Sequence, residues 1–323
     1  MRRLKTILFP QHDNFEPWCS DVMELVGVRH DIAVFDENES IERQFEGVEV
    51  VVDHGGRSAT REMMDAATDA RLWQILGTGF DRFDLDHIKS KGIAAANTPG
   101  QFSSIALAET AMMLILMLAR EYRQSYESVQ TGVFGKPLGR ELVGATLGVI
   151  GFGASGQELA RRAKPFGMRI MGIDVVKIDP DKLADIEPEF MGSPDDMDQV
   201  IEASDYVSLH LHLNDETRHV INACRIGKMK PTACLINVAR GALVDEDALS
   251  EALIDQRIGG AGLDVFAREP VDPTLPAFQL PNVVITPHIA GVTYETSRRR
   301  AMCVVENVDR IAEGLEPIYR IDT

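Results

Sequence analysis

The chain has 323 residues, enough for two domains of ordinary size, and its apolar share of 45% is normal for a globular protein. Its formal net charge of −17 argues against nucleic acid or an anionic membrane surface as a partner, because both attract clustered lysine and arginine. The one dense basic run, residues 297–302, is interpreted as the solvated face of a late helix.

The cysteines are too scattered for a disulfide framework or a zinc site, since no two of them form a C-x-x-C pair. They are Cys19, Cys224, Cys234 and Cys303. Unpaired cysteines fit a reducing compartment, so we expect a cytoplasmic protein without a bound metal. The amino-terminal residues lack the long apolar region and the small-residue cleavage site of a signal peptide.

In the first hundred residues, short apolar runs alternate with amphipathic patterns. We expect strands over 5–10, 31–36, 48–53, 73–78 and 92–98, and helices over 17–27 and 61–70. Strands that alternate with helices in this way imply a parallel sheet that is covered on both faces.

A long apolar stretch at 105–120 connects this region to the next one. It contains Glu109 and ends in Arg120, so it is too short and too polar to span a bilayer, and no membrane partner is expected. We expect a buried helix that begins near Ser103 and packs against a second subunit.

The remaining chain repeats the alternation of strands and helices. Strands are expected over 146–153, 168–174, 206–213, 234–240, 260–266 and 282–288, and helices over 155–166, 196–204 and 245–255. A final polar helical pattern, 294–314, is expected to return to the first unit. The sequence therefore predicts an α/β protein with two Rossmann-like, doubly wound parallel-sheet domains and an interdomain cleft. The predicted domains are residues 1–101 plus 290–323, and residues 102–289.

The stretch LGVIGFGASGQELA contains the spacing G-x-G-x-x-G at Gly151, Gly153 and Gly156. An apolar strand precedes this glycine loop and an amphipathic helix begins near Ser155, which is the context of a dinucleotide-binding turn. The first glycine permits the tight turn, the second lets the backbone approach a pyrophosphate, and the third allows close helix packing. The amino end of the helix, with Ala154 and Ser155, then presents N–H groups to the phosphates.

The next expected strand ends at Asp174. An acid at this place accepts hydrogen bonds from the ribose hydroxyls of the adenosine and repels the extra phosphate of NADP. The residues that follow are Val175, Val176 and Lys177, without an arginine. NAD is therefore the expected cofactor, favoured over NADP, and residues 102–289 are predicted to form the NAD-binding domain.

Three candidate catalytic residues lie near the end of the chain: Arg240 in INVARGALVDE, Glu269 in LDVFAREPVD and His288 in TPHIAG. With these residues the sequence strongly resembles the D-isomer-specific 2-hydroxyacid dehydrogenases. The resemblance covers nearly the whole chain through six motifs in the family's order: LGTGFDRFD, ANTPG, LGVIGFGASG, LINVARGALVDE, GLDVFAREP and TPHIAG. It implies an NAD-dependent enzyme that interconverts a small D-2-hydroxy acid and its 2-keto acid, with the three residues as the catalytic trio.

These residue types suit the chemistry that the resemblance implies. When hydride moves between nicotinamide and a substrate carbon, a proton must move on the adjoining oxygen, and histidine is a suitable acid and base near neutral pH. Glu269 would bond the far imidazole nitrogen of His288, orient the ring and favour the imidazolium. Arg240 would bind the substrate carboxylate with its planar fork and polarise the carbonyl oxygen.

The resemblance also implies further binding residues. Thr78 and Gly79 match the family loop whose backbone N–H groups hold the substrate carboxylate. Asp264 matches the acid that accepts a hydrogen bond from the nicotinamide carboxamide, and Ala239 would lie beside that ring. His210 matches a histidine near the adenosine side of the cofactor, although the family's proline two residues later is a histidine in this chain.

The identity of the acid stays open at this point. Arg57 lies in a segment that resembles the phosphoglycerate dehydrogenase branch, where it could reach a phosphate or an extra carboxylate. That branch often has a second basic residue before the GTG loop, where this chain has Ile75 and Leu76. Glyoxylate, hydroxypyruvate or another short 2-keto acid is equally expected, and the discontinuous domain, residues 1–101 plus 290–323, is predicted to bind it.

Two further expectations concern partners. The family resemblance and the apolar helix indicate a homodimer. The alternative function is an NAD(H)-sensing scaffold like the transcriptional corepressors built on this fold, which keep the same trio but recognise peptides through the first domain.

Overall fold

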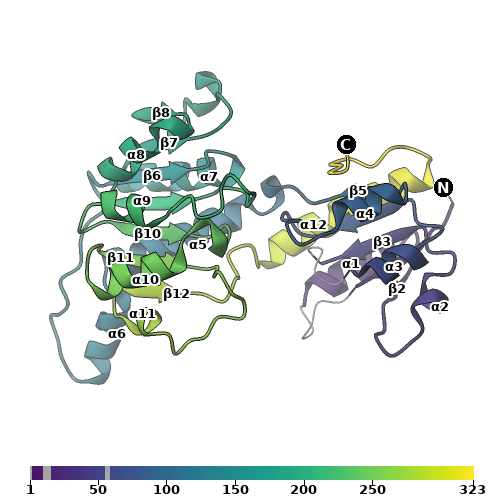
Figure 1. Ribbon diagram of the computed structural model, residues 1–323, viewed down its shortest axis with the longest axis horizontal. Coiled ribbons are helices and arrows are strands. Elements are labelled where there is room, and N and C mark those ends of the chain that lie inside the picture. Colours follow the sequence, from purple (N-terminus) through teal and green to yellow (C-terminus); the bar gives the residue numbers. More distant parts are fainter. Residues whose placement is uncertain (1, 10–15, 55–58) are drawn as a thin grey trace. The chain divides into compact units, whose positions relative to one another are not determined.

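The computed structural model describes residues 2–9, 16–54 and 59–323 of the chain (Figure 1). The chain divides into two compact units: unit 1 is Met1–Phe102 with Val292–Thr323, and unit 2 is Ser103–Gly291. In the described residues each unit has one sheet of parallel strands with helices on both faces. This arrangement confirms the predicted α/β class with two doubly wound, Rossmann-like sheets.

Unit 1 has a five-stranded sheet in the order β2-β1-β3-β4-β5 among the residues described. Its strands are β1 (Lys5–Leu8), β2 (Asp31–Val34), β3 (Val50–Asp53), β4 (Leu72–Ile75) and β5 (Ala94–Ala96). Its helices are α1 (Trp18–Gly27), α2 (Ile41–Phe45), α3 (Arg61–Ala66), α4 (Leu85–Ser90), η1 (Gly100–Phe102) and α12 (Tyr294–Ala312). Apolar residues of α1 and α12 cover one face, and an aromatic cluster with Phe9, Phe45 and Trp73 covers the other. The strand order puts the topological switch point between β1 and β3.

Helix α12 brings the end of the chain into unit 1. It packs along α1, where the Ser297 hydroxyl donates a hydrogen bond to the Asp21 carboxylate at 2.5 Å. Further along the helix, the buried Asn307 amide donates to Gln74 Oε1 in β4 at 2.6 Å. Polar bonds therefore hold this helix in addition to its apolar face.

The basic run of α12 is only in part the solvated face that the sequence suggested. Arg298 pairs with Asp21 at 3.3 Å, and Arg299 Nε donates to a carbonyl of η1 at 3.0 Å. The Arg300 guanidinium carbon lies 5.0 Å from the centre of the Trp18 ring, which is a cation–π distance. The interpretation therefore holds in part: the Arg298 side chain is 43% exposed, whereas Arg299 and Arg300 contact residues from distant segments.

Unit 2 has a seven-stranded sheet in the order β12-β11-β10-β9-β6-β7-β8. Its strands are β6 (Thr146–Ile150), β7 (Arg169–Ile173), β8 (Phe190–Gly192), β9 (Tyr206–Leu209), β10 (Cys234–Asn237), β11 (Gly260–Leu263) and β12 (Val283–Ile285). Its helices are α5 (Ser104–Ala119), α6 (Tyr122–Gln130), α7 (Ala154–Ala163), η2 (Lys164–Phe166), η3 (Pro180–Leu183), η4 (Pro194–Asp196), α8 (Met197–Ala203), α9 (Ala223–Lys228), η5 (Gly241–Leu243), α10 (Glu246–Ile254) and α11 (Pro276–Gln279). The strand order reverses between β6 and β9, so the switch point of unit 2 lies there.

Helix α5 is the apolar helix that the sequence predicts. It packs against α7 and β11, and a Cβ on Gly262 of β11 would stand 2.9 Å from Leu114 Cβ, so the close approach needs the glycine. The helix is not buried on all sides, because Ile105 and Met113 remain 42% and 40% exposed. In the part of the chain that the structure describes, no helix combines the length and apolarity needed to cross a bilayer.

Candidate functional site

The glycine loop of unit 2 lies at the carboxyl end of β6, beside the switch point. Gly151 has a φ of +94°, and a Cβ on it would stand 2.6 Å from the His210 carbonyl oxygen. A Cβ on Gly156 would stand 2.3 Å from the Gly151 carbonyl oxygen. Gly153 is exposed, and a Cβ there would meet nothing within 4 Å. The loop is therefore packed tightly against the protein at Gly151 and Gly156. It is open at Gly153, where a ligand can approach the backbone.

Helix α7 begins at Ala154, one residue before the expected start, and directs its amino end to the same place. The N–H of Gln157 donates to the Gly153 carbonyl at 3.0 Å. The N–H groups that precede Gln157 in the helix point out of its amino end, where no helical carbonyl is available to them. With the helix dipole they suit an anion such as a pyrophosphate.

His210 follows β9, on the other side of the switch point, and contacts the glycine loop. Its backbone N–H donates to the Ile150 carbonyl at 2.8 Å. Its ring Nδ1 lies 3.0 Å from Ser155 Oγ, and its Nε2 lies 3.0 Å from Ser208 Oγ. Burial lowers the pKa of His210 to about 4, so the ring is neutral near pH 7. Sequence reasoning missed Ser208, because a serine inside an apolar strand carries no signal of its own.

Asp174 directly follows β7, the strand next to β6. Its Oδ1 accepts a hydrogen bond from the Val176 N–H at 2.9 Å. Val175 and Val176 are 80% and 66% exposed, so this strand end faces solvent. A carboxylate one strand away from the glycine loop can accept bonds from ribose hydroxyls. The open glycine, the amide donors and this acid together fit a nicotinamide dinucleotide.

Arg240, Glu269 and His288 follow three neighbouring strands, β10, β11 and β12. Because parallel strands end at the same edge of a sheet, the fold brings these residues to one edge of unit 2. The Glu269 side chain is only 13% exposed, and both of its carboxylate oxygens lie 3.0 Å from His288 Nδ1. A carboxylate of low exposure thus engages one ring nitrogen of a histidine whose side chain is 37% exposed. Glu269 therefore orients the imidazole ring of His288 through Nδ1.

A small hydrogen-bonded turn carries Arg240. The Asn237 amide donates to the Arg240 carbonyl at 2.9 Å and accepts from the Ala239 N–H at 3.1 Å. Arg240 Nη1 donates to the Ala239 carbonyl at 2.8 Å. Asn237, which the sequence analysis did not single out, therefore fixes the backbone from which the guanidinium extends.

A buried carboxylate organises the loop that carries His288. Asp264 accepts hydrogen bonds from Thr286 Oγ1 at 2.6 Å and from the N–H groups of Ile289 and Ala290, each at 2.8 Å. Its backbone carbonyl accepts from the His288 N–H at 2.8 Å. Burial raises the pKa of Asp264, and the hydrogen bonds to its carboxylate oppose that shift. The expected contact of this acid with a nicotinamide amide stays a prediction, and the structure adds a role in holding the His288 loop.

The GTG loop of unit 1 follows β4 at the carboxyl edge of its sheet. Thr78 Oγ1 donates to the Thr98 carbonyl at 3.0 Å, and the Asn97 amide donates to the Thr78 carbonyl at 2.8 Å. Gly79 comes next and is partly exposed. Arg300 of α12 reaches this loop, with Nη2 at 3.4 Å from Thr78 Oγ1.

His54 directly follows β3, beside the switch point of unit 1. Burial, and secondly the positive charge of Arg300, lower the pKa of His54 to about 4. Its Nε2 lies 3.7 Å from Cys19 Sγ. His54 was not among the expected site residues, and Arg300 was expected only as part of a solvated basic run. Arg57, the expected phosphate or carboxylate ligand, lies outside the described residues.

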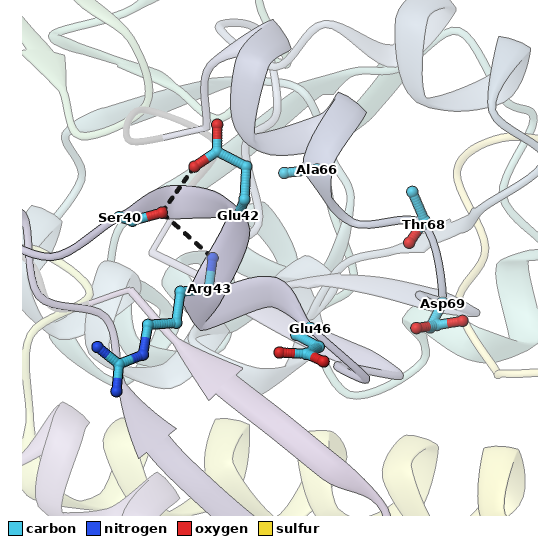
Figure 2. A pocket seen from close by; sticks show the side chains of 7 residues that line it. All are labelled: Ser40, Glu42, Arg43, Glu46, Ala66, Thr68 and Asp69. Carbon is cyan, nitrogen blue, oxygen red and sulfur yellow. Dashed lines mark hydrogen bonds between the residues drawn. The ribbon is translucent and has the colours of Figure 1, made fainter.

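A shallow hollow lies elsewhere in unit 1, between α2 and α3 (Figure 2). It is lined by Ser40, Glu42, Arg43, Glu46, Ala66, Thr68 and Asp69. In Figure 2 the Ser40 hydroxyl is engaged by Glu42 at 2.7 Å and by the Arg43 N–H at 3.3 Å. Several lining residues lead into the amino ends of β3 and β4, whereas ligands of open α/β sheets bind at the carboxyl ends. We therefore place no function in this hollow.

Metal and thiol chemistry find no support in the residues that the structure describes. Within residues 2–9, 16–54 and 59–323, no three histidine, cysteine, aspartate or glutamate side chains form a group that could hold a metal ion. In the part of the chain that the structure describes, the cysteines form no disulfide. Burial raises the pKa of Cys234 and of Cys303 to about 12, which makes both poor nucleophiles.

Comparisons with known proteins agree with the fold. Residues 112–290 match the family model of the D-isomer specific 2-hydroxyacid dehydrogenase NAD-binding domain. The chain is 38% identical to the hydroxypyruvate reductase of Thermotoga maritima over 265 residues, 81% of this chain and 84% of that protein. The structure is similar to D-lactate dehydrogenase from Aquifex aeolicus with NAD and lactic acid, with TM-score 0.84, 29% identity, and coverage of 98% of this chain and 99% of that one. It is also similar to the NADPH-dependent glyoxylate/hydroxypyruvate reductase of Sinorhizobium meliloti with NADP and malonate, with TM-score 0.82, 27% identity, and coverage of 99% and 97%.

Proposed function

The chain belongs to the D-isomer-specific 2-hydroxyacid dehydrogenases, a family of oxidoreductases with an NAD-binding domain, and we propose that it interconverts a small D-2-hydroxy acid and its 2-keto acid with His288 as the acid and base. The observation that carries the proposal is the contact of His288 Nδ1 with both oxygens of Glu269 at 3.0 Å. A ring held in this way presents Nε2 for proton exchange with the substrate oxygen.

The contact between His288 and Glu269 indicates how the proton moves during the reaction. In the reducing direction the keto carbon would take up a hydride, which the nicotinamide cofactor supplies when it is bound. His288 starts as the imidazolium, with Nδ1–H donated to Glu269, and gives its Nε2 proton to the substrate oxygen. The ring ends neutral, and Glu269 stabilises the charged form at the start of the step. Oxidation of the hydroxy acid runs the same transfer in reverse.

The substrate carboxylate needs donors that match its geometry. We assign this role to the planar guanidinium of Arg240, which can form two parallel hydrogen bonds and polarise the keto oxygen. In unit 1, the backbone N–H groups of Thr78 and Gly79 are assigned to the substrate as well. The guanidinium of Arg300, 3.4 Å from Thr78 Oγ1, adds positive charge to that loop.

Unit 2 is proposed to bind NAD in preference to NADP. Gly151, Gly153 and Gly156 would shape the pyrophosphate turn, and Asp174 would accept bonds from the ribose hydroxyls. Replacing Asp174 by alanine should therefore raise the Kd for NADH by about tenfold and reduce the discrimination against NADPH, because a charged hydrogen-bond acceptor is lost. Fluorescence titration with both cofactors measures it. An unchanged NADH affinity would remove Asp174 from the ribose site.

The experiment that tests the function is NADH oxidation against a panel of 2-keto acids, including glyoxylate, hydroxypyruvate, pyruvate and a phosphorylated hydroxypyruvate. Turnover at ordinary enzyme rates, about 1–10³ per second, with one of them supports the proposal and names the acid. Tight NADH binding without turnover of any acid would contradict the proposal and favour the NAD(H)-sensing scaffold.

We further propose that the protein is a homodimer joined through unit 2. The segment 122–143, which contains α6 and lies at the margin of unit 2 in Figure 1, exposes an unusual number of large apolar side chains. They are Tyr122, Tyr126, Val129, Val133, Phe134, Leu138 and Val143, exposed by 45–85%. A contiguous stretch of this kind is typical of a surface that a partner covers, and a second copy is the partner that the family suggests.

A further inference from the structure

We propose that His210 is a positioning residue of the cofactor site, which donates its Nδ1–H to Ser155 Oγ and thereby directs the Ser155 hydroxyl proton to a pyrophosphate oxygen. The inference rests on the proposed cofactor binding by unit 2. It assigns a defined chemical task to two side chains that face each other across the switch point.

The first observation is the place of Ser155. It is the second residue of α7, between the exposed Ala154 and the buried Gly156, and is itself partly exposed. Its backbone N–H is among those that precede the first internal hydrogen bond of the helix. A hydroxyl at this place can add a side-chain donor to the backbone donors that an anion would meet at the helix end.

The second observation is that His210 is fixed from several directions. Its N–H donates to the Ile150 carbonyl at 2.8 Å, and its own carbonyl oxygen lies where a Cβ on Gly151 would approach to 2.6 Å. Its two ring nitrogens each lie 3.0 Å from a serine hydroxyl, Ser155 Oγ and Ser208 Oγ. The ring thus connects the end of β9 to the first turn of α7.

The direction of the hydrogen bonds follows from charge. Burial keeps His210 neutral, so only one ring nitrogen carries a proton. A phosphate oxygen only accepts hydrogen bonds, so Ser155 must donate its proton to that oxygen and accept a bond from elsewhere. The proton of His210 must then sit on Nδ1, and Ser208 must donate to Nε2. All three donors point one way, and each bond polarises the next.

The test uses NADH, ADP-ribose and adenosine as ligands of the full-length protein. Ser155→Ala should weaken the binding of NADH and of ADP-ribose by about tenfold, as expected for a lost hydrogen bond to a charged group. The affinity for adenosine should stay within about twofold of that of the unaltered protein. Binding is measured by NADH fluorescence titration and by competition with the other two ligands. Equal affinities of Ser155→Ala and the unaltered protein for NADH would overturn the inference.

Two variants of His210 form a matched pair. The side-chain amide of His210→Asn can donate near the Nδ1 position, whereas that of His210→Gln reaches the Nε2 position. We expect NADH affinity within about threefold of normal for the asparagine variant and a loss close to that of Ser155→Ala for the glutamine variant. If the glutamine variant bound NADH more tightly than the asparagine variant, the proposed direction of the hydrogen bond from His210 Nδ1 to Ser155 Oγ would be wrong. Thermal unfolding of both variants controls for misfolding, since both remove the same ring.

A direct readout is the tautomer of His210 in the protein saturated with ADP-ribose, whose pyrophosphate occupies the proposed site. Nitrogen-15 NMR of histidine-labelled protein should show a neutral ring with its proton on Nδ1, assigned by loss of the signal in His210→Asn. A proton on Nε2 would overturn the inference. The proposed function fails separately, because tight NADH binding without turnover of any acid would leave the Ser155 and His210 results intact.

Discussion

His288 has a backbone conformation that a residue with a side chain adopts only when its neighbours hold it there. Its φ is +58°, in the left-handed region, which costs of order 1–3 kcal/mol. The buried Asp264 carboxylate offsets this cost by bonding Thr286 before the histidine and Ile289 and Ala290 after it. The strained residue and its buried acid together fix the point where the ring leaves the backbone.

Replacement of His288 by alanine should lower kcat by about 10²–10⁴, because the acid–base contribution is lost. The Kd for NADH should stay within about twofold, since the glycine loop and Asp174 are untouched. Stopped-flow assays and fluorescence titration measure the two quantities. Glu269→Gln serves as a control, because it keeps the size of the partner of His288 Nδ1 but removes its charge. The kcat of this variant should lie between those of the unaltered protein and of His288→Ala. A loss of only a few-fold in the alanine variant would remove His288 from the proton transfer.

The buried His54 and the partly buried His210 predict a dependence of stability on pH. The pKa values of His54 and His210 are lowered from 6.5 to about 4, so in acid the unfolded chain takes up protons that the folded protein excludes. The free energy of unfolding is therefore highest, with respect to these two groups, above pH 6.5, and it decreases as the pH falls from 6.5 towards 4. By pH 5 each should cost about 2 kcal/mol of unfolding free energy. Urea denaturation at pH 7.5 and 5 measures the difference, and asparagine at either position should reduce it. The assignment of this pH dependence to His54 and His210 would be contradicted if the unfolding free energy changed equally between pH 7.5 and 5 in these variants and in the unaltered protein.

At the scale of elements, helix α12 shows how a late segment completes an early sheet. Its buried Asn307 donates to Gln74 Oε1 and to the Ile318 carbonyl, and its side-chain oxygen accepts from the Ile318 N–H. One amide therefore joins the helix to β4 and to the segment that follows the helix. The sheet of unit 1 depends on a part of the chain more than 200 residues away.

Asn307→Ala should lower the free energy of unfolding of unit 1 by about 2–3 kcal/mol, because it leaves buried partners without their hydrogen bonds. Glu306 is exposed in the same helix turn, and Glu306→Ala should change the value by no more than about 0.5 kcal/mol. Urea denaturation followed by tryptophan fluorescence measures unit 1, since Trp18 and Trp73 both lie in it. Equal stability of the two variants would show that the amide network is dispensable.

At the scale of the whole molecule, the two units repeat one principle with different strand orders. Each sheet is parallel, and each has a switch point where loops at the carboxyl ends of two strands separate. In unit 2 that point holds the glycine loop and His210, while the adjacent strands β10, β11 and β12 carry the candidate trio. The candidate cofactor and catalytic residues of unit 2 thus lie at one edge of its sheet.

The proposed dimer gives a prediction at this scale. Phe134 and Leu138 are 85% and 84% exposed, so replacing both by serine should not disturb the fold of a monomer. The double variant should convert the protein from dimer to monomer at micromolar concentration in analytical ultracentrifugation. A matched change on another surface, Val28→Ser, also at an exposed site (72%), should leave the dimer intact. A monomeric unaltered protein would exclude this interface.

The sequence by itself determined the fold class, the position of the dinucleotide turn and the family. These are local properties: alternating strands and helices, glycine at positions of tight turn or close packing, and motifs whose order survives in the linear chain. The pairing of Glu269 with His288 was also expected, but from the family resemblance, because no local pattern links two residues that lie 19 positions apart in the chain.

Only the tertiary structure decided which polar groups meet. Asp264 forms hydrogen bonds with the loop around His288, Ser208 forms one with His210, and Arg300 lies beside Thr78. None of these pairings has a sequence signature, because a buried polar side chain is stabilised by whichever partner the fold brings within hydrogen-bond distance. Strand order sets those partners, and strand order results from long-range packing that no local pattern encodes.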